Sequence, residues 1–190
     1  MKKSIQDRLR ELRSKVRGND LSQGGGLGNE VNYHIFDYDP EDEQVVMLEV
    51  GRLEESLSHI KVFNIYEIVI SILNDEGYLE SVMDIEKTAG AKVANQAISE
   101  IINSGSSGKA IVDRIVSSVK KGDIVCLTGV GQTHEFIRPH ALLANLQNSI
   151  NDIENPVILF YPGGYSGQSL SLFNIFPAEN YYRAFKLVER

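Results

Sequence analysis

Two segments rich in glycine and polar residues carry the side chains that could bind a ligand. Residues 128–135 follow the apolar run 124–127, and residues 161–169 follow the apolar run 157–160. Such runs are typical of strands buried on both faces of a parallel sheet, whose carboxyl ends meet at one rim. Ligands of open α/β sheets bind beyond that rim, so we expect a site there, with Asp37 ending a third strand. The alternative is that these glycines only form tight turns.

Three glycine motifs come close to known catalytic or nucleotide-binding patterns, and none is complete. The segment 105–110 contains Gly-Lys but follows a predicted helix and offers Ala110 where a P-loop needs a hydroxyl. Gly129-Val130-Gly131 begins like a dinucleotide fingerprint, but His134 replaces its third glycine. Its backbone could still face an anion, with Arg138 nearby. In residues 164–168, Gln168 replaces the second glycine of a nucleophile elbow around Ser166.

Metal and thiol chemistry find no better support in the sequence. His134 and His140 are six residues apart, a spacing that no regular helix presents on one face. Asp37 could hold magnesium with a nucleotide, but a turn role explains it equally well. Cys126 lies within an apolar run, as an inert buried thiol does. We therefore predict no catalytic residue, no bound metal and no cofactor.

The composition is that of a globular cytoplasmic protein. The 190 residues include 42% hydrophobic residues, carry a net charge of −7 and contain one cysteine. This length predicts one domain spanning residues 1–190. One cysteine excludes a disulfide framework, and no apolar run is long enough to cross a bilayer. The acidic balance disfavours general nucleic-acid binding, which depends on phosphate contacts.

The charge is unevenly distributed along the chain. Residues 1–17 contain seven basic and two acidic residues, whereas residues 30–55 contain nine acidic residues and one basic residue. Ile5, Leu9, Leu12 and Val16 form an apolar stripe on a predicted basic helix. We expect this helix to pack on the body of the chain, the alternative being an arm for a partner. The two oppositely charged segments could attract each other, within one chain or between two.

Strand-like and helix-like patterns alternate along the chain. Strands are predicted at 31–37, 61–66, 124–127 and 157–160, with a final edge strand at 181–188. Helices are predicted from Asp39, as N-cap, to Leu57, then within 67–121 and at 139–150, and residues 18–30 form a glycine-rich loop. This order predicts an α/β protein, a three-layer sandwich with a mostly parallel sheet flanked by helices. The layering is P-loop-like, without a Walker A motif.

Several segments together resemble a known family. They are residues 26–30, 35–40, 127–131, 138–146, 160–170 and 180–187. In this order they resemble the BrxB family of bacterial BREX (bacteriophage exclusion) systems, over nearly the whole chain. The chain departs from the family pattern at residues 31–33 and 134–136, which affects the details of two loops.

The resemblance implies membership of a phage-defence system and no particular reaction. BREX systems methylate host DNA and block phage replication, and their operons also encode PglZ, which resembles alkaline phosphatases. No catalytic activity is carried over from the family. The resemblance implies an adaptor that binds another BREX protein, with PglZ as the favoured partner. The matching positions are Asn29, Glu30, Asp37, Arg138, His140, Gly163, Gln168, Tyr182 and Arg183, to which Tyr165 is added as a C-terminal aromatic residue.

Two other functions stay open at this point. A degenerate nucleotide-binding domain with a regulatory role fits the α/β layering, but it lacks the Lys and Ser/Thr that hold phosphates and magnesium. Nucleic-acid binding through residues 1–17 needs only a local basic face. The sequence leaves a homo-oligomer open as well.

Overall fold

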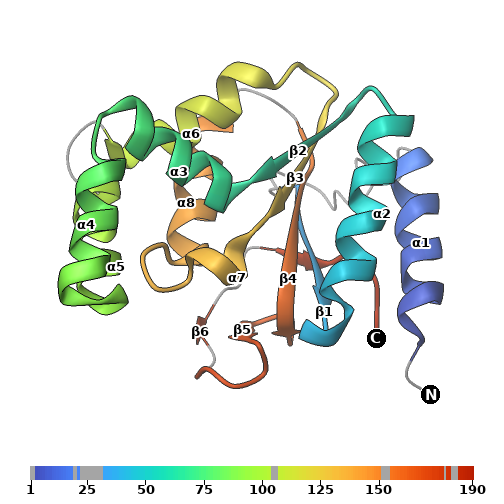
Figure 1. Ribbon diagram of the computed structural model, residues 1–190. Coiled ribbons are helices and arrows are strands. Elements are labelled where there is room, and N and C mark those ends of the chain that lie inside the picture. Colours follow the sequence, from blue (N-terminus) through green and yellow to red (C-terminus); the bar gives the residue numbers. More distant parts are fainter. Residues whose placement is uncertain are drawn as a thin grey trace.

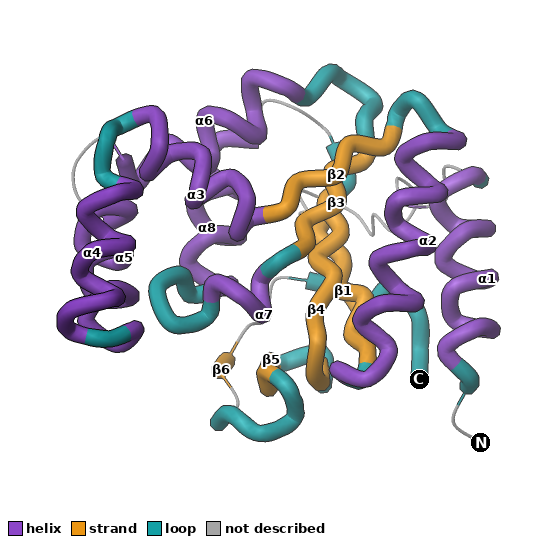
Figure 2. The backbone as a smooth tube through the Cα atoms, viewed as in Figure 1, coloured by secondary structure: helices purple, strands orange, loops and turns teal. Residues whose placement is uncertain are grey.

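The computed structural model describes residues 3–18, 21, 32–103, 107–150, 155–177, 179–180 and 184–190. Helices separate the first four strands, and in the described residues no helix lies between the later strands (Figures 1 and 2). The strands are β1 (Tyr33–Tyr38), β2 (Ile60–Asn64), β3 (Ile124–Thr128), β4 (Val157–Tyr165), β5 (Ser169–Leu172), β6 (Glu179–Asn180) and β7 (Phe185–Lys186). The helices are α1 (Ile5–Arg17), α2 (Glu43–Ser56), α3 (Ile65–Asp75), α4 (Leu79–Ala89), α5 (Ala91–Asn103), α6 (Ser107–Ser118), α7 (Val130–Thr133) and α8 (Pro139–Ile150), with a 3-10 turn at Pro40–Asp42.

The sheet is parallel through its main part, in the order β2-β3-β4-β1-β7. Helices α1 and α2 cover one face, and α3, α6 and α8 cover the other (Figure 1). The pair α4 and α5 packs outside α3 and α6. This arrangement confirms the predicted three-layer α/β class with a mostly parallel sheet.

Alternation along each strand divides the core into two parts. Ile35, Leu127 and Leu159 face the α3, α6 and α8 side. Phe36, Cys126 and Phe160, their neighbours in sequence, face the α1 and α2 side. Successive strand side chains point to opposite faces, so a strand covered on both sides must be apolar at every position. This is why the unbroken runs 124–127 and 157–160 predicted buried strands correctly.

The basic helix α1 packs on the body of the chain, as expected. Leu9, Leu12 and Val16 of its apolar stripe are buried. On the flank, Arg13 donates to both carboxylate oxygens of Glu49 in α2, with Nε–Oε1 and Nη2–Oε2 distances of 2.6 Å. A bidentate pair of this kind is the strongest geometry for arginine and a carboxylate. The attraction between the basic and acidic segments therefore acts within one chain.

Several element boundaries differ from the sequence prediction; the helix predicted from Asp39, for example, begins as a 3-10 turn at Pro40–Asp42 and becomes α-helical at Glu43. Strand β2 ends at Asn64, whose side chain accepts from the backbone N–H groups of Tyr66 and Glu67 and so begins α3. Strand β4 continues to Tyr165, because after Pro162 it leaves the parallel sheet and pairs antiparallel with β5. The last strand, β7, has only two residues and lies at the edge beside β1. Most of the predicted loop 18–30 lies outside the described residues.

None of the helices in the described ranges is both long and apolar enough to cross a membrane.

The packing of α1 predicts the effect of truncating its apolar stripe. Leu12 is fully buried, so Leu12→Ala should lower the free energy of unfolding by about 2–5 kcal/mol through lost contacts and a cavity. Leu48 on α2 is 63% exposed, and Leu48→Ala should change that free energy by no more than about 0.5 kcal/mol. Urea unfolding of both variants measures the difference. Equal effects would contradict the docking of α1.

Candidate functional site

The carboxyl ends of the strands meet at one rim, as the sequence predicted. Parallel pairing sets Asp37 of β1 beside Tyr161 of β4, and Asn64 of β2 beside Thr128 of β3. The segment after β3 reaches the segment after Tyr161: a β-carbon added at Gly131 would lie 3.1 Å from Cγ of Pro162. Residues from four strands thus contribute to this rim.

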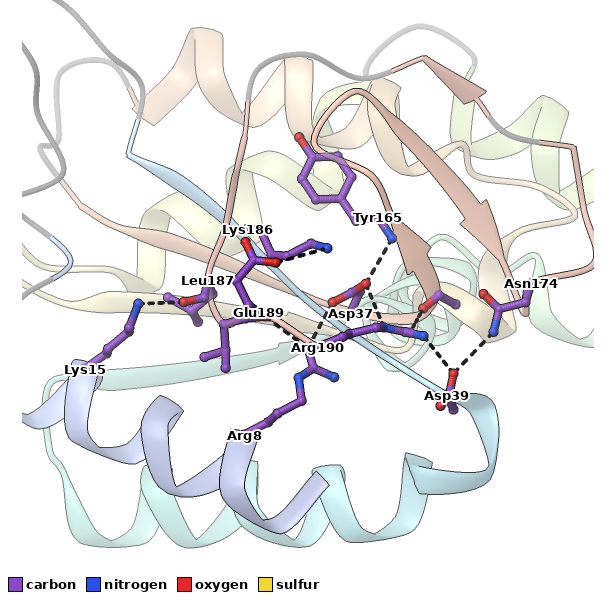
Figure 3. A network of polar contacts seen from close by, with 12 residues as sticks. Arg8, Lys15, Asp37, Asp39, Tyr165, Asn174, Lys186, Leu187, Glu189 and Arg190 are labelled. Carbon is purple, nitrogen blue, oxygen red and sulfur yellow. Dashed lines mark hydrogen bonds and ion pairs between the residues drawn. The ribbon is translucent and has the colours of Figure 1, made fainter. Parts of the chain in front are cut away.

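A buried carboxylate, Asp37, lies at the centre of the polar contacts at the rim (Figure 3). Its Oδ1 accepts from Nη2 of Arg8 at 3.0 Å. Its Oδ2 accepts from the backbone N–H of Tyr165 at 3.1 Å and from Nε of Arg190 at 3.0 Å. The side chain of Asp37 is 1% exposed, so these three donors take the place of water.

Arg190 joins Asp37 to two further groups. Its Nη1 donates to Oδ1 of Asp39 at 2.8 Å, and its Nη2 donates to the carbonyl oxygen of Gly163. The same Oδ1 of Asp39 accepts from the amide of Asn174 at 3.5 Å. Asp39 was predicted to cap the following helix, but its side chain makes no cap hydrogen bond there. The charged guanidinium of Arg190 is the stronger donor and takes this carboxylate instead.

Arg8 brings the N-terminal helix into the same network. Besides Asp37, its Nη2 donates to the carbonyl oxygen of Val188 at 3.2 Å, and its guanidinium lies 4.8 Å from the ring centroid of Phe36. Burial lowers the pKa of the Arg8 guanidinium, and the neighbouring Asp37 carboxylate opposes that shift. The network therefore contains two arginines and two aspartates with balanced charge. Such an arrangement holds segments together and presents no unpaired charge to a ligand.

The hairpin of β4 and β5 completes the rim, and it includes three predicted site residues. Gly163 has φ +151°, and a β-carbon there would lie 2.2 Å from the carbonyl oxygen of Ser171 on β5. The hydroxyl of buried Tyr165 donates to the carbonyl oxygen of Ala184 at 2.8 Å. Gln168 is exposed in the turn that joins the two strands. Gly163 and Tyr165 thus have structural roles here, and Gln168 faces solvent.

The structure separates the predicted site residues into groups. Asp37, Gly163 and Tyr165 come together around Arg190, whereas Arg138 is exposed at the start of α8, beyond β3. Asn29, Glu30, Tyr182 and Arg183 lie outside the described residues, as does the side chain of His140. Sequence reasoning missed Arg8, Asp39 and Arg190 as members of the network. The only available signal was the charge contrast between residues 1–17 and 30–55.

Reactive groups do not gather around this network in the described residues. Burial raises the pKa of the Cys126 thiol to about 12, which keeps it protonated and unreactive. Burial also raises the pKa of the Tyr165 hydroxyl, which already donates to a carbonyl. Across the ranges that the structure describes, no three His, Cys, Asp or Glu side chains are placed to hold a metal ion.

Fold and rim together define a three-layer α/β protein whose strand-end site is an internal ion-pair network. Residues 61–187 match the sequence model of the family described as "BREX protein BrxB". A BREX protein BrxB of Bacillus cereus is 36% identical, over 98% of this chain and 98% of its own length. One of Escherichia coli is 32% identical, over 97% of this chain and 92% of its own. No solved structure gives a significant match.

The chain belongs to the BrxB family of the BREX phage-defence system.

The network predicts a large effect of removing its central charge. Asp37→Asn leaves the buried guanidinium of Arg8 without a countercharge and should lower the free energy of unfolding by about 3–5 kcal/mol. Asp84→Asn removes a surface partner of Lys87, and the change there should stay below about 1 kcal/mol. Denaturant unfolding compares the two variants. An Asp37→Asn protein as stable as Asp84→Asn would show that the network is dispensable.

The hairpin makes a separate prediction about Gly163. Gly163→Ala must displace Ser171 on β5, and the protein should lose about 1–3 kcal/mol of unfolding free energy. Gly51→Ala in helix α2 is the matched control, because apart from the adjoining helix backbone no atom lies within 4 Å of its new methyl group. Alanine is the better helix former, so this control should gain up to about 1 kcal/mol. Thermal melting that shifts both variants in the same direction would refute the assigned role of Gly163.

Proposed function

We propose that this protein is a non-catalytic adaptor of a BREX system that binds another BREX protein in the cytoplasm, with PglZ as the first candidate. Family membership supports the setting. The adaptor role is supported by the chemistry of the rim. Asp37, the buried carboxylate at the position where α/β proteins bind their ligands, is fully engaged by Arg8, Arg190 and a backbone amide.

This observation carries the proposal because a catalytic carboxylate must reach the reacting group. A general base acts within hydrogen-bond distance of the proton that it removes, in a cleft that a substrate can enter. The Asp37 side chain is only 1% exposed, and its partners come from both ends of the chain and from β4. Its arrangement is that of a structural centre, and the surface around it is then available for a partner protein.

The nucleotide-binding alternative is less well supported by the same geometry. Two carboxylates, Asp37 and Asp39, lie at the carboxyl end of β1, where phosphates would approach. Arg8 and Arg190, the cations beside them, already pair with these carboxylates and so offer no free positive charge to a phosphate. Dinucleotide and P-loop sites instead place glycines and free backbone N–H groups at this position.

Nucleic-acid binding through α1 is also weakened by the contacts of its basic residues. Arg8 pairs with Asp37, Arg13 with Glu49 and Lys3 with Glu11. Lys15 donates to the carbonyl oxygen of Leu187. Nucleic-acid affinity comes largely from lysine and arginine side chains that neutralise phosphates, and these side chains already have partners within the chain.

Co-purification tests the adaptor role. The tagged chain, expressed with the other BREX proteins of its operon, should retain PglZ at a fixed ratio, measured by light scattering of the eluate. Arg138→Ala and Gln168→Ala remove exposed side chains at predicted contact positions, and each should reduce the retained partner at least about tenfold.

Matched controls make this result specific. Arg10→Ala on α1 and Gln96→Ala on α5 remove exposed side chains of the same types elsewhere, and should leave retention unchanged. Retention of no BREX protein by the wild type would refute the adaptor role. Wild-type retention by folded Arg138→Ala and Gln168→Ala would refute these two contact sites alone.

A further inference from the structure

An exposed apolar turn follows β5 on the rim. Ile175 is 81% exposed and Phe176 is 42% exposed, and both belong to the segment 172–177, here named the aromatic turn. The ring of Phe176 packs 4.9 Å from that of His134 and 6.2 Å from that of Phe173. Gly131 makes room for this cluster, because a β-carbon there would lie 3.0 Å from the Phe173 ring. The aromatic turn therefore projects an aliphatic and an aromatic side chain from a packed base.

The backbone of the aromatic turn is strained. Phe173 and Asn174 have φ angles of +54° and +59°, and among the described residues they are the non-glycine positions with positive φ. A left-handed conformation costs a bulky residue about 1–3 kcal/mol and persists only where its surroundings enforce it. Strain of this kind concentrates at functional sites.

Hydrogen bonds enforce the conformation of the aromatic turn. The N–H of Phe173 donates to the carbonyl oxygen of Pro162 at 2.8 Å, and those of Ile175 and Phe176 donate to that of Leu172 at 3.1 Å. The hydroxyl of Ser171 donates to the carbonyl oxygen of Phe176 at 2.9 Å. The backbone that carries the two exposed side chains is thus ordered before any partner arrives, which reduces the entropy lost on binding.

The charges around the aromatic turn indicate the chemistry of what it binds. Residues 161–177 contain no charged side chain. On the neighbouring segments of the rim, the Glu135 carboxylate lies 3.5 Å from His134, and that of Glu67 accepts from Asn64, next to Gly129. Arg138, three residues after Glu135, is an exposed base, so acids outnumber bases among these three positions. Both glutamates are exposed. A complementary surface would have an apolar pocket with lysine or arginine at its edge.

We propose that the aromatic turn is the docking element of the adaptor, inserting Ile175 and Phe176 into an apolar pocket of the partner protein, with basic partner residues facing Glu135 and Glu67. This proposal rests on the proposed function and names the surface that performs it. The groove between α1 and α2 is lined mainly by charged residues, so this groove offers no apolar pocket to the aromatic turn of a second copy. Those residues are Arg13, Arg17, Glu49, Arg52 and Glu55.

The test measures the affinity for the BREX partner after changes to the aromatic turn. Each other BREX protein of the operon, PglZ first, is immobilised and titrated with the purified chain. Ile175→Asp and Phe176→Asp should weaken binding at least about tenfold, as loss of a central apolar anchor does. Glu135→Gln should weaken it a few-fold and reduce its dependence on salt.

Two apolar residues that are exposed elsewhere serve as controls. Leu48→Asp on α2 and Met83→Asp on α4 replace side chains that are 63% and 47% exposed, and should leave affinity within about twofold. Thermal melting of all variants confirms that they are folded.

Each outcome decides one question. Binding of no BREX protein by the wild type overturns the adaptor role and this proposal together. Wild-type affinity in folded Ile175→Asp and Phe176→Asp overturns the docking element alone. Light scattering could instead show that these substitutions convert a dimer of this chain to a monomer and leave the affinity for the BREX partner unchanged. The aromatic turn would then bind a second copy, and the assigned partner would be wrong.

Discussion

Asp37 is a carboxylate buried between two arginines, and several distant segments depend on how it is satisfied. Its donors are 29 residues away at Arg8, 128 at Tyr165 and 153 at Arg190. An unpaired charge at this depth would be too costly to bury. The folded state therefore has to bring helix α1, strand β1, the end of β4 and residue 190 together at once. A buried ion pair adds little net stability compared with apolar packing, and its better-attested effect is to specify one arrangement.

The layers of the fold could be predicted from the sequence because their signals are local. The runs 124–127 and 157–160 are apolar at every position, as strands covered on both faces must be. The stripe through Leu9, Leu12 and Val16 correctly indicated a helix with one buried face. The meeting of the strand ends at one rim follows from parallel pairing alone, so it too was predictable. None of these inferences required knowing which residues meet across the chain.

The features that sequence reasoning missed depend on contacts between distant residues. Asp39 precedes Pro40 at a helix start, so its local pattern indicates an N-cap, yet it binds Arg190. Residues 162–165 contain Pro-Gly-Gly and resemble a loop, but pairing with β5 makes them a strand. In both cases a partner more than five residues away changes what the local pattern favours. The meeting of the strand ends was predictable, and the pairing of the side chains there was not.

The rim has two parts of opposite character. On one side, buried and half-buried charges pair with one another; on the other, Ile175 and Phe176 are exposed and apolar. Asp39 connects them, since its Oδ1 accepts from both Arg190 and Asn174, a residue of the strained turn. The ion pairs thus reach the aromatic turn through one long side-chain hydrogen bond, beside the shorter hydrogen bonds that hold its backbone. A protein that binds through a rigid apolar surface needs such support, because its specificity depends on presenting the same shape to each partner.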